Sequence, residues 1–314
     1  MNPASNSAPL VSILVPTWNR VAKLRQLLDV LLPAVHARLE LDLVISDNSS
    51  TDGTDAFLAS LPAHPRIRFI RQPINYGPNL HLAWLYGQAR GKYLWMIGDD
   101  DMVEPDLPGI VIEKLQADPA LGLFHLPHRA YPPNAPAFQS NCPPAILRVQ
   151  RARELFGQYI VWMTFISGNV MRTDLVHAAL PLVTFATAYW PMDLLVRATA
   201  NHPAAVLNQC KITAGTEITW ANDEFAISNF DYPTAILQCP VLSRREKSAC
   251  LHNRYDLAPE FLDRLVLHNP RLMLEIFLVA PSLCSVSFFL RLIRKGARRL
   301  SGARPPKPQV PAEK

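Results

Sequence analysis

Three adjacent carboxylates are the residues of this sequence that most clearly suggest chemistry. The triplet Asp99–Asp101 follows Gly98 and the apolar run Tyr93–Ile97, which is typical of a buried strand. Because like charges at the end of a strand repel one another, this arrangement favours a bound cation, and oxygen ligands suit Mg²⁺ or Mn²⁺. Such an ion can bridge the phosphates of a nucleotide diphosphate and neutralise it as a leaving group. The alternative is a solvated acidic turn that caps the next helix.

Polar, turn-forming residues also follow three apolar runs that precede the triplet. The runs are Val11–Val15, Leu41–Ser46 and Ile67–Ile70, and the turns after them read Pro16-Thr17-Trp18-Asn19-Arg20, Asp47-Asn48-Ser49-Ser50-Thr51-Asp52-Gly53-Thr54 and Asn75-Tyr76-Gly77-Pro78-Asn79. A carboxylate such as Asp47 at the first crossover of a parallel sheet can accept hydrogen bonds from a base or ribose. The second turn alone is an ordinary Ser/Thr/Asp/Gly stretch. Four polar strand ends in one sheet, the last triply acidic, point to a nucleotide-diphosphate site.

The elements that must position these turns alternate between strand and helix. A helix face built on Leu24, Leu27, Leu28 and Leu31 follows the first run, and we expect Pro33 to end that helix. Further helices are predicted at Pro78–Ala89 and Asp106–Ala117. This alternation predicts an α/β fold with a mostly parallel sheet flanked by helices, and ligands of such sheets lie beyond the carboxyl ends of the strands.

The second half of the chain is less regular. We expect an extended stretch at Phe165–Arg172, and helices at Arg148–Val161, Trp190–Ala200, Leu257–Leu267, Arg271–Val279 and Ser287–Leu300. A Pro-rich stretch near residues 131–144 predicts a long loop.

As a set, PTWNR, ISDNSSTDGT, NYGPN and GDDD resemble inverting glycosyltransferase family two, whose members have the GT-A fold. The resemblance covers about residues 10–125, and the spelling of the motifs is most similar to abequosyltransferase-like O-antigen enzymes. It implies a nucleotide-sugar site made of Pro16, Thr17, Asn19, Arg20, Asp47, Asn75, Gly77, Asp99 and Asp100, with a divalent metal held by Asp99, Asp100 and Asp101. Many members have Asp where this chain has Gly98. Asp100 then matches the usual metal ligand, and the roles of Asp99 and Asp101 stay open.

A general base and the acceptor contacts must come from the second half, because an inverting transfer removes the proton of the acceptor hydroxyl. Family members often carry an acidic residue at the start of a helix after a Gly-containing acceptor loop. By that resemblance Asp193 is the candidate base, and Gly168, Asn169 and Trp190 are candidate acceptor contacts. The alternative is that Asp193 is a first-turn carboxylate favoured by the helix dipole. Asp223 and Glu224 are the reserve candidates.

Other residues suggest chemistry less strongly. Pro127 separates His125 from His128, so we do not expect the two imidazoles to form a helical metal pair. Three tryptophans of the first half are expected in the core or in the wall of the site, whereas those of the second half are left open as sugar platforms. They are Trp18, Trp84 and Trp95 in the first half, and Trp162, Trp190 and Trp220 in the second.

The basic charge of the chain is confined to its end. Residues 291–314 hold 8 Lys or Arg against 1 acidic residue, while residues 1–290 have a net charge of −2. A general nucleic-acid surface is therefore not supported. Between Phe288 and Leu300 an apolar arc opposes a basic arc, which predicts an interfacial helix on an anionic membrane surface. The alternative is that the apolar arc packs on the catalytic domain.

Cysteine use and hydropathy suggest where the chain works. Its 5 cysteines are scattered without a Cys-x-x-Cys pair, so we expect no disulfide framework or zinc module and a reducing compartment. We expect no signal peptide and no spanning helix. Together with the basic end, this predicts a cytoplasmic protein that is peripheral on the inner face of the cell membrane.

The sequence thus predicts an enzyme that moves a sugar from a nucleotide-diphosphate donor to a glycan or lipid-linked acceptor with inversion, in bacterial surface polysaccharide synthesis. Residues 1–125 form the donor half, 126–255 the acceptor half, 256–303 the C-terminal helices and 304–314 a disordered tail. Two alternatives are a sugar nucleotidyltransferase, for which the turn after the first strand lacks a Gly-rich basic loop, and a non-catalytic scaffold that binds a nucleotide or a glycan.

Overall fold

The computed structural model of the chain describes residues 8–129, 142–185, 187–215, 231–256, 262, 265, 269–283 and 288. Its first half alternates strands and helices, as the sequence predicts. The strands are β1 (Val11–Thr17), β2 (Leu41–Asp47), β3 (Ile67–Arg71) and β4 (Tyr93–Met96), and the helices are α1 (Val21–Ala37), α2 (Thr54–Ser60), α3 (Gly77–Tyr86) and α4 (Leu107–Ala117).

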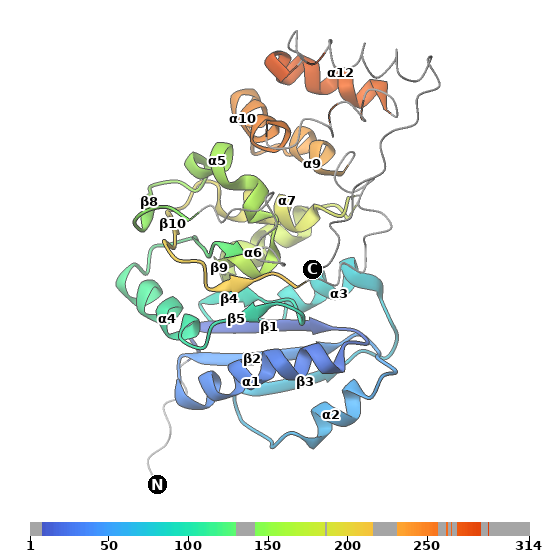
Figure 1. Cartoon of the computed structure of the whole chain (residues 1–314), viewed down its shortest axis with the longest axis vertical. Coiled ribbons are helices and arrows are strands. Elements are labelled where there is room, and N and C mark those ends of the chain that lie inside the picture. The colour runs from blue at the N-terminus through green and yellow to red at the C-terminus, as the bar shows by residue number, and fades with distance from the viewer. Residues whose placement is uncertain are drawn as a thin grey trace, which may run out of the picture.

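The second half adds shorter strands and most of the remaining helices. Its elements are β6 (Leu123–His125), β8 (Leu147–Val149), α5 (Arg153–Met163), β9 (Asn169–Arg172), α6 (Thr173–Ala179), α7 (Trp190–Thr199) and β10 (Ala204–Val206). A small sheet joins β5 (Met102–Val103), β11 (Ile212–Thr213) and β7 (His128–Arg129). The helices α9 (Tyr232–Gln238), α10 (Arg244–Tyr255) and α12 (Pro270–Val279) lie at the end of the molecule away from β3 (Figure 1).

The main sheet has 8 strands in the order β3-β2-β1-β4-β9-β6-β10-β8. The first four are parallel, whereas β9 runs antiparallel to both of its neighbours, β4 and β6. Strand β9 therefore lies between two strands that both precede it in the chain, β4 and β6. The predicted fold class, a mostly parallel sheet flanked by helices, is confirmed.

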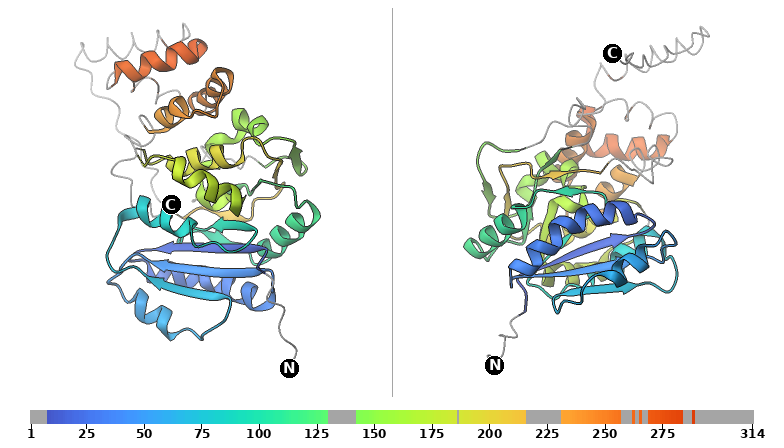
Figure 2. Two further views of the ribbon diagram at one scale, coloured as in Figure 1. Left: turned by 180° about the vertical axis from the view of Figure 1, so that it is seen from behind. Right: turned by 60° about the horizontal axis from the view of Figure 1, so that its bottom comes forward.

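Alternating side chains of the sheet build a core on each of its faces. Ile13 packs in the cluster that includes α1 and α4, while its neighbour Leu14 packs in the cluster that includes α3, α5 and α7. The two further views show α1 and α3 on opposite faces of the strands (Figure 2). Because both faces are covered, the middle strands are mostly apolar, and their polar residues lie near the strand ends.

Three local predictions were wrong. Pro33 lies inside α1 instead of ending it, because Ala34 and Val35 remain buried and packing offsets the lost hydrogen bond. The segment predicted as one helix at Arg148–Val161 begins with strand β8, which pairs with β10. The expected extended stretch at Phe165–Arg172 contains a 3₁₀ turn, Ile166–Gly168, before β9.

The cysteines also differ from expectation. Cys142 and Cys210 form a disulfide, with Cα atoms 6.5 Å apart, across a sequence separation of 68 residues that gave no signal. Cys239 and Cys250 are buried free thiols. In the part of the chain that the structure describes, no helix has the length and apolar character that a membrane crossing requires.

Candidate active site

The turns after β1, β2, β3 and β4 meet at the carboxyl edge of the parallel strands. Thr17 pairs with Asp47 in the ladder between β1 and β2, and Asp47 pairs in turn with Arg71 at the end of β3. On the other side of β1, the N–H of Ile97 donates to the carbonyl of Leu14 at 2.9 Å, just before the acidic triplet. The structure thus brings the predicted donor-side residues to one edge.

Asp47 is a fixed acceptor at this edge. Its side chain is 1% exposed, and both carboxylate oxygens are occupied. Oδ1 accepts from the backbone N–H of Ser50 at 2.9 Å, and Oδ2 accepts from Nη1 of Arg71 at 3.0 Å. Arg71 was missed by sequence reasoning, although a lone arginine that ends a strand beside an acidic strand end was an available signal.

The first two turns are bonded to each other. Asn19 has a left-handed φ of 52°, a conformation that Asn tolerates better than most residues. Its backbone N–H donates to Oγ of Ser50 at 2.8 Å, and its Oδ1 accepts from the N–H of Thr51 at 2.7 Å. Pro16 lies within β1 and pairs with Ser46. This interlocking fixes the backbone from which Arg20 extends.

The third turn is held against the second by amide side chains. Nδ2 of Asn48 donates to Oδ1 of Asn75 at 2.8 Å, and the same oxygen accepts from the N–H of Gly77 at 2.8 Å. Gly77 has a φ of +73°, which a side chain would strain. Asn75 and Gly77 therefore shape the start of α3 beside the site.

Two carboxylates of the triplet share one arginine. Nη1 of Arg20 lies 3.1 Å from Oδ1 of Asp99 and 3.1 Å from Oδ2 of Asp100. Asp99 also accepts from the Thr17 hydroxyl at 2.7 Å. Burial raises the pKa of Asp99, against the opposing effects of Thr17 and Arg20. The acidic motif and the first turn are thus one electrostatic unit.

Asp101 points to the second half of the chain instead. Its Oδ1 accepts from the N–H of Gly215 at 2.9 Å, and its Oδ2 accepts from the hydroxyl of Ser167, whose oxygen accepts from the N–H of Gly98 at 2.8 Å. Burial raises the pKa of Asp101 to about 7, outweighing both hydrogen bonds. The sequence suggested no role here for Ser167 or Gly215, and the only hint was that Ser167 directly precedes the predicted acceptor residues Gly168 and Asn169.

These contacts bear on the metal site expected at Asp99–Asp101, which stays a prediction. Among the described residues, no three His, Cys, Asp or Glu side chains are arranged to hold a metal ion. Asp101 has both oxygens occupied, and Asp99 is shared between Thr17 and Arg20, so neither is placed as a ready ligand. Among these carboxylate oxygens, only Oδ1 of Asp100 has neither a hydrogen bond nor an ion pair with the described residues. Because Mg²⁺ at nucleotides is bound by one or two carboxylates plus phosphates and water, the residues fit an ion that arrives with a diphosphate.

The predicted acceptor residues Gly168 and Asn169 lie directly before and at the start of β9. A Cβ atom on Gly168 would lie 2.9 Å from the carbonyl of Leu126, so the backbone is closely packed there. Asn169 is buried, donates to the carbonyls of Met163 and Phe165 at 2.8 and 2.9 Å, and lies 3.0 Å from Nδ1 of His125. Asn169 thus braces the turn that carries Ser167.

The candidate base Asp193 lies in the first turn of α7. Its Oδ2 accepts from Nε of Arg197 at 2.7 Å, one helical turn later. Burial raises the pKa of the Cys239 thiol to about 11, and the nearby Asp193 carboxylate raises it further in the same direction. Its role as base stays a prediction, as does that of Asp223 and Glu224, which lie outside the described residues.

Trp190, the remaining predicted acceptor contact, is 1% exposed. Its Nε1 donates to Oδ1 of Asn79 at 3.1 Å, and its ring meets Tyr86 and Phe185 edge to face. Trp190 thereby joins α7 to α3 in the core, and an acceptor contact by this ring stays a prediction. Trp220 lies outside the described residues.

The other aromatic residues have varied surroundings. Trp95 is buried and donates to the carbonyl of Ser167 at 2.8 Å, while Trp18 and Trp84 are exposed. His128 stacks on Phe165 at 3.9 Å, with Trp162 edge-on. Burial lowers the pKa of His125 to about 4 and that of His128 to about 3, so both rings are neutral at physiological pH.

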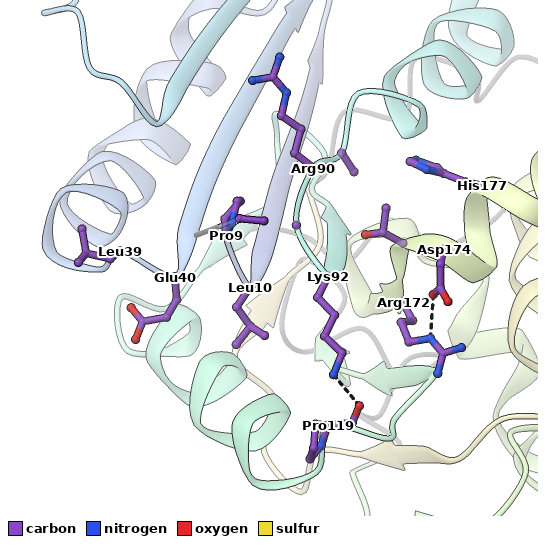
Figure 3. Close-up of a pocket in the computed structure, with 14 residues that line it drawn as sticks. Pro9, Leu10, Leu39, Glu40, Arg90, Lys92, Pro119, Arg172, Asp174 and His177 are labelled. Carbon is purple, nitrogen blue, oxygen red and sulfur yellow. Dashed lines mark hydrogen bonds and ion pairs between the residues drawn. The ribbon is translucent and has the colours of Figure 1, made fainter. Parts of the chain in front are cut away.

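A pocket of about 1010 Å³ lies at the opposite, amino edge of the strands (Figure 3). Pro9, Glu40 and Lys92, which line it, directly precede or flank the starts of β1, β2 and β4. Lys92 points to the carbonyl of Pro119, and Arg172 to Asp174. None of the predicted donor-site residues lines this pocket, so it is separate from the acidic motif.

Sequence comparison supports the motif-based expectation. The profile of Glycosyl transferase family 2 matches residues 12–175. The chain is similar to abequosyltransferase RfbV of Salmonella typhimurium, with 32% identity over 31% of this chain and 30% of that protein. It is also similar to the succinoglycan biosynthesis protein ExoO of Rhizobium meliloti, with 30% identity over 37% of this chain and 32% of that protein. The chain thus spans about a third of the length of these relatives.

Solved structures agree in fold. The S. aureus TarS fragment 1–349 in complex with UDP-GlcNAc matches with a TM-score of 0.62 and 15% identity, over 87% of this chain and 80% of that one. The mannosyltransferase PcManGT of Pyrobaculum calidifontis, in complex with GDP-Man and Mn²⁺, matches with a TM-score of 0.52 and 14% identity, over 95% and 89%. With strand ends, acidic motif and profile in agreement, this chain belongs to glycosyl transferase family 2.

Proposed function

We propose that this protein transfers a sugar from a nucleotide-diphosphate donor to a glycan or lipid-linked acceptor, with inversion at the sugar, in the synthesis of a bacterial surface polysaccharide. The observation that carries the proposal is the shared contact of Arg20 with Asp99 and Asp100 at the strand edge that also holds Asp47. A cationic and an anionic group side by side suit a metal-associated diphosphate.

Different donor-side residues would contact different parts of the nucleotide sugar. Asp47, which Ser50 and Arg71 hold at the strand edge, would accept hydrogen bonds from the base or ribose through the lone pairs that these contacts leave. Arg20 is the group to contact the diphosphate, because a guanidinium binds phosphate oxygens in a bidentate manner. Asp100 would hold Mg²⁺ or Mn²⁺, which when bound neutralises the departing diphosphate.

Inversion requires the acceptor oxygen to attack the anomeric carbon from the side opposite the diphosphate. The new bond forms as the bond from that carbon to the phosphate oxygen breaks, and its electron pair leaves with the diphosphate. A base must take the acceptor proton. Asp193 is the proposed base, and for this role the ion pair with Arg197 must open or serve to orient the carboxylate.

The acceptor class and the membrane surface are also proposals. The named activities of RfbV and ExoO, an abequosyltransferase and a succinoglycan biosynthesis protein, favour a surface polysaccharide. Residues 289–300, which lie outside the described part of the chain, would bring the enzyme to the inner face of the membrane. There, apolar side chains enter the interface and basic ones meet anionic headgroups. Phe288, which the sequence placed on the apolar arc, is buried in the core instead.

A thermal-shift screen tests the donor site. UDP, GDP, CDP and dTDP are each added with Mn²⁺, and at least one should raise the melting temperature by mass action. The same nucleotide, as its sugar conjugate, should then be hydrolysed slowly by the purified enzyme without acceptor. If none of the four stabilises the full chain, the donor-site proposal is wrong.

A further inference from the structure

Arg20 occupies the position of a cation between two carboxylates. A single nitrogen, Nη1, lies 3.1 Å from Oδ1 of Asp99 and 3.1 Å from Oδ2 of Asp100. The arginine side chain is 15% exposed, and those of Asp99 and Asp100 are 6% and 16% exposed. Because such partly buried charges are poorly screened, the guanidinium neutralises much of their repulsion.

Asp101 does not share in this arrangement, because Ser167 and Gly215 occupy its oxygens. The negative charge open to a divalent ion is therefore that of Asp99 and Asp100, the pair that Arg20 already contacts. An ion approaching Asp100 without other ligands would meet a positive charge within a few ångströms and would gain few oxygens from the described residues. Metal binding to the empty protein should be weak for both reasons.

We propose that Arg20 is the resident counter-ion of the acidic motif and is exchanged for the divalent metal when a diphosphate arrives. The phosphates supply oxygen ligands for the metal, and they give the guanidinium a new anionic partner when it leaves Asp100. Arg20 precedes α1 on a backbone fixed through Asn19, so its side chain alone needs to move. Metal and nucleotide then bind cooperatively, and neither binds tightly without the other.

The first experiment measures Mn²⁺ alone, which needs no knowledge of the donor. Free Mn²⁺ is followed by its electron paramagnetic resonance signal during titration of the full chain, of Arg20→Met and of Arg25→Met. Arg25 is a matched control inside α1, the helix that Arg20 precedes, and its guanidinium lies 3.8 Å over the ring of Phe57. We expect Arg20→Met to bind Mn²⁺ at least about tenfold more tightly than the unaltered chain. Arg25→Met should bind Mn²⁺ with the same affinity as the unaltered chain.

Two further variants locate the effect. Asp100→Asn in the Arg20→Met background should remove the gained affinity. Arg20→Lys keeps the charge but loses the planar guanidinium, so its Mn²⁺ affinity should lie between those of the unaltered chain and Arg20→Met. It replaces Arg20→Met in the test if circular dichroism shows that Arg20→Met is unfolded. Mn²⁺ affinity that is unchanged or weaker in both Arg20 variants overturns the proposal.

The second experiment rests on the proposed function and measures coupling. Mn²⁺ titrations are repeated with the nucleoside diphosphate, among UDP, GDP, CDP and dTDP, that raises the melting temperature. For each protein we compare the Mn²⁺ affinity with and without the nucleotide. This ratio should be about tenfold larger for the unaltered chain than for Arg20→Met. Equal ratios would overturn the exchange. If no nucleotide binds, the proposed donor site fails, while the result with Mn²⁺ alone still decides the role of Arg20.

Discussion

The hydroxyl of Ser167 donates to the buried carboxylate of Asp101, and this contact joins the two halves of the chain at the site. Ser167 also accepts from the N–H of Gly98, so one side chain serves both ends of the acidic motif. Replacing Ser167 by Ala should lower the free energy of unfolding by about 1–3 kcal/mol, because two buried polar groups lose their partner. Urea unfolding measures it. Ser60→Ala, at an exposed residue of α2 whose hydroxyl donates only to the carbonyl of Phe57, is the control and should change stability less.

Asp100→Ala should abolish transfer and leave the fold intact. The metal would lose its best-placed carboxylate, while Asp99 would keep Thr17 and Arg20 as partners. Transfer to acceptor and circular dichroism are measured together, and EDTA should reproduce the loss in the unaltered enzyme, reversibly. Full activity in EDTA would exclude the metal role and indicate a metal-independent enzyme.

Asp193→Asn should retain donor binding and lower turnover by about 10²–10⁴-fold if Asp193 is the base. The alternative is that Asp193 only stabilises α7 through its ion pair with Arg197 and takes no part in catalysis. Arg197→Met separates the two roles, because it breaks the same ion pair and leaves the carboxylate. If both variants lower the melting temperature equally and spare turnover, the base lies elsewhere and Asp223 and Glu224 should be tested.

Three buried histidines should make the protein sensitive to acid. Burial lowers the pKa of His81 and His125 to about 4 and that of His128 to about 3. In the unfolded chain they take up protons near pH 6.5, so stability falls as the pH drops below that value. Asp101, whose pKa is raised to about 7, opposes this trend with one proton in the same range.

His128→Phe isolates one of these contributions. The new ring can still stack on Phe165, and the dependence of unfolding free energy on pH between 6 and 4 should weaken by up to about 1.4 kcal/mol per unit. Urea unfolding at pH 6, 5 and 4 provides the measurement. An equal slope in His128→Phe and the unaltered chain would mean that His128 is protonated in the folded protein.

Deletion of residues 285–314 should release the protein from anionic vesicles and spare hydrolysis of the donor. Flotation with vesicles that contain phosphatidylglycerol measures attachment, and high salt should weaken it for the full chain. An intact protein that ignores such vesicles at low salt, or a deletion that unfolds, would instead support packing of this segment on the catalytic domain.

The sequence predicted the donor half well because its signals are local. Apolar runs ended by polar turns identified β1 to β4, and parallel strands necessarily bring such turns to one edge, which is why Thr17, Asp47 and Asp99 were found together. Motif spelling also indicated the family.

Contacts between distant segments could not be predicted in the same way. The pairing of Asp101 with Ser167 and Gly215 spans 66 and 114 residues, and neither partner stands in a distinctive motif. The Cys142–Cys210 bond likewise has no signature in its spacing. Pro33 was misjudged because the local cost of a proline was visible in the sequence, whereas the burial of Ala34 and Val35 was not.

The reversed direction of β9 limits how the enzyme can be divided. An antiparallel strand starts where its neighbours end. Ser167, which precedes β9, therefore lies at the edge of the sheet where the acidic motif follows β4. A fragment that stops at residue 125 would contain β4 and β6 but not the strand between them. Its unpaired edges would be free to associate with other chains. A two-piece or truncated form of this enzyme should therefore carry β9 on the same piece as β4 to remain soluble and keep its acidic motif in shape.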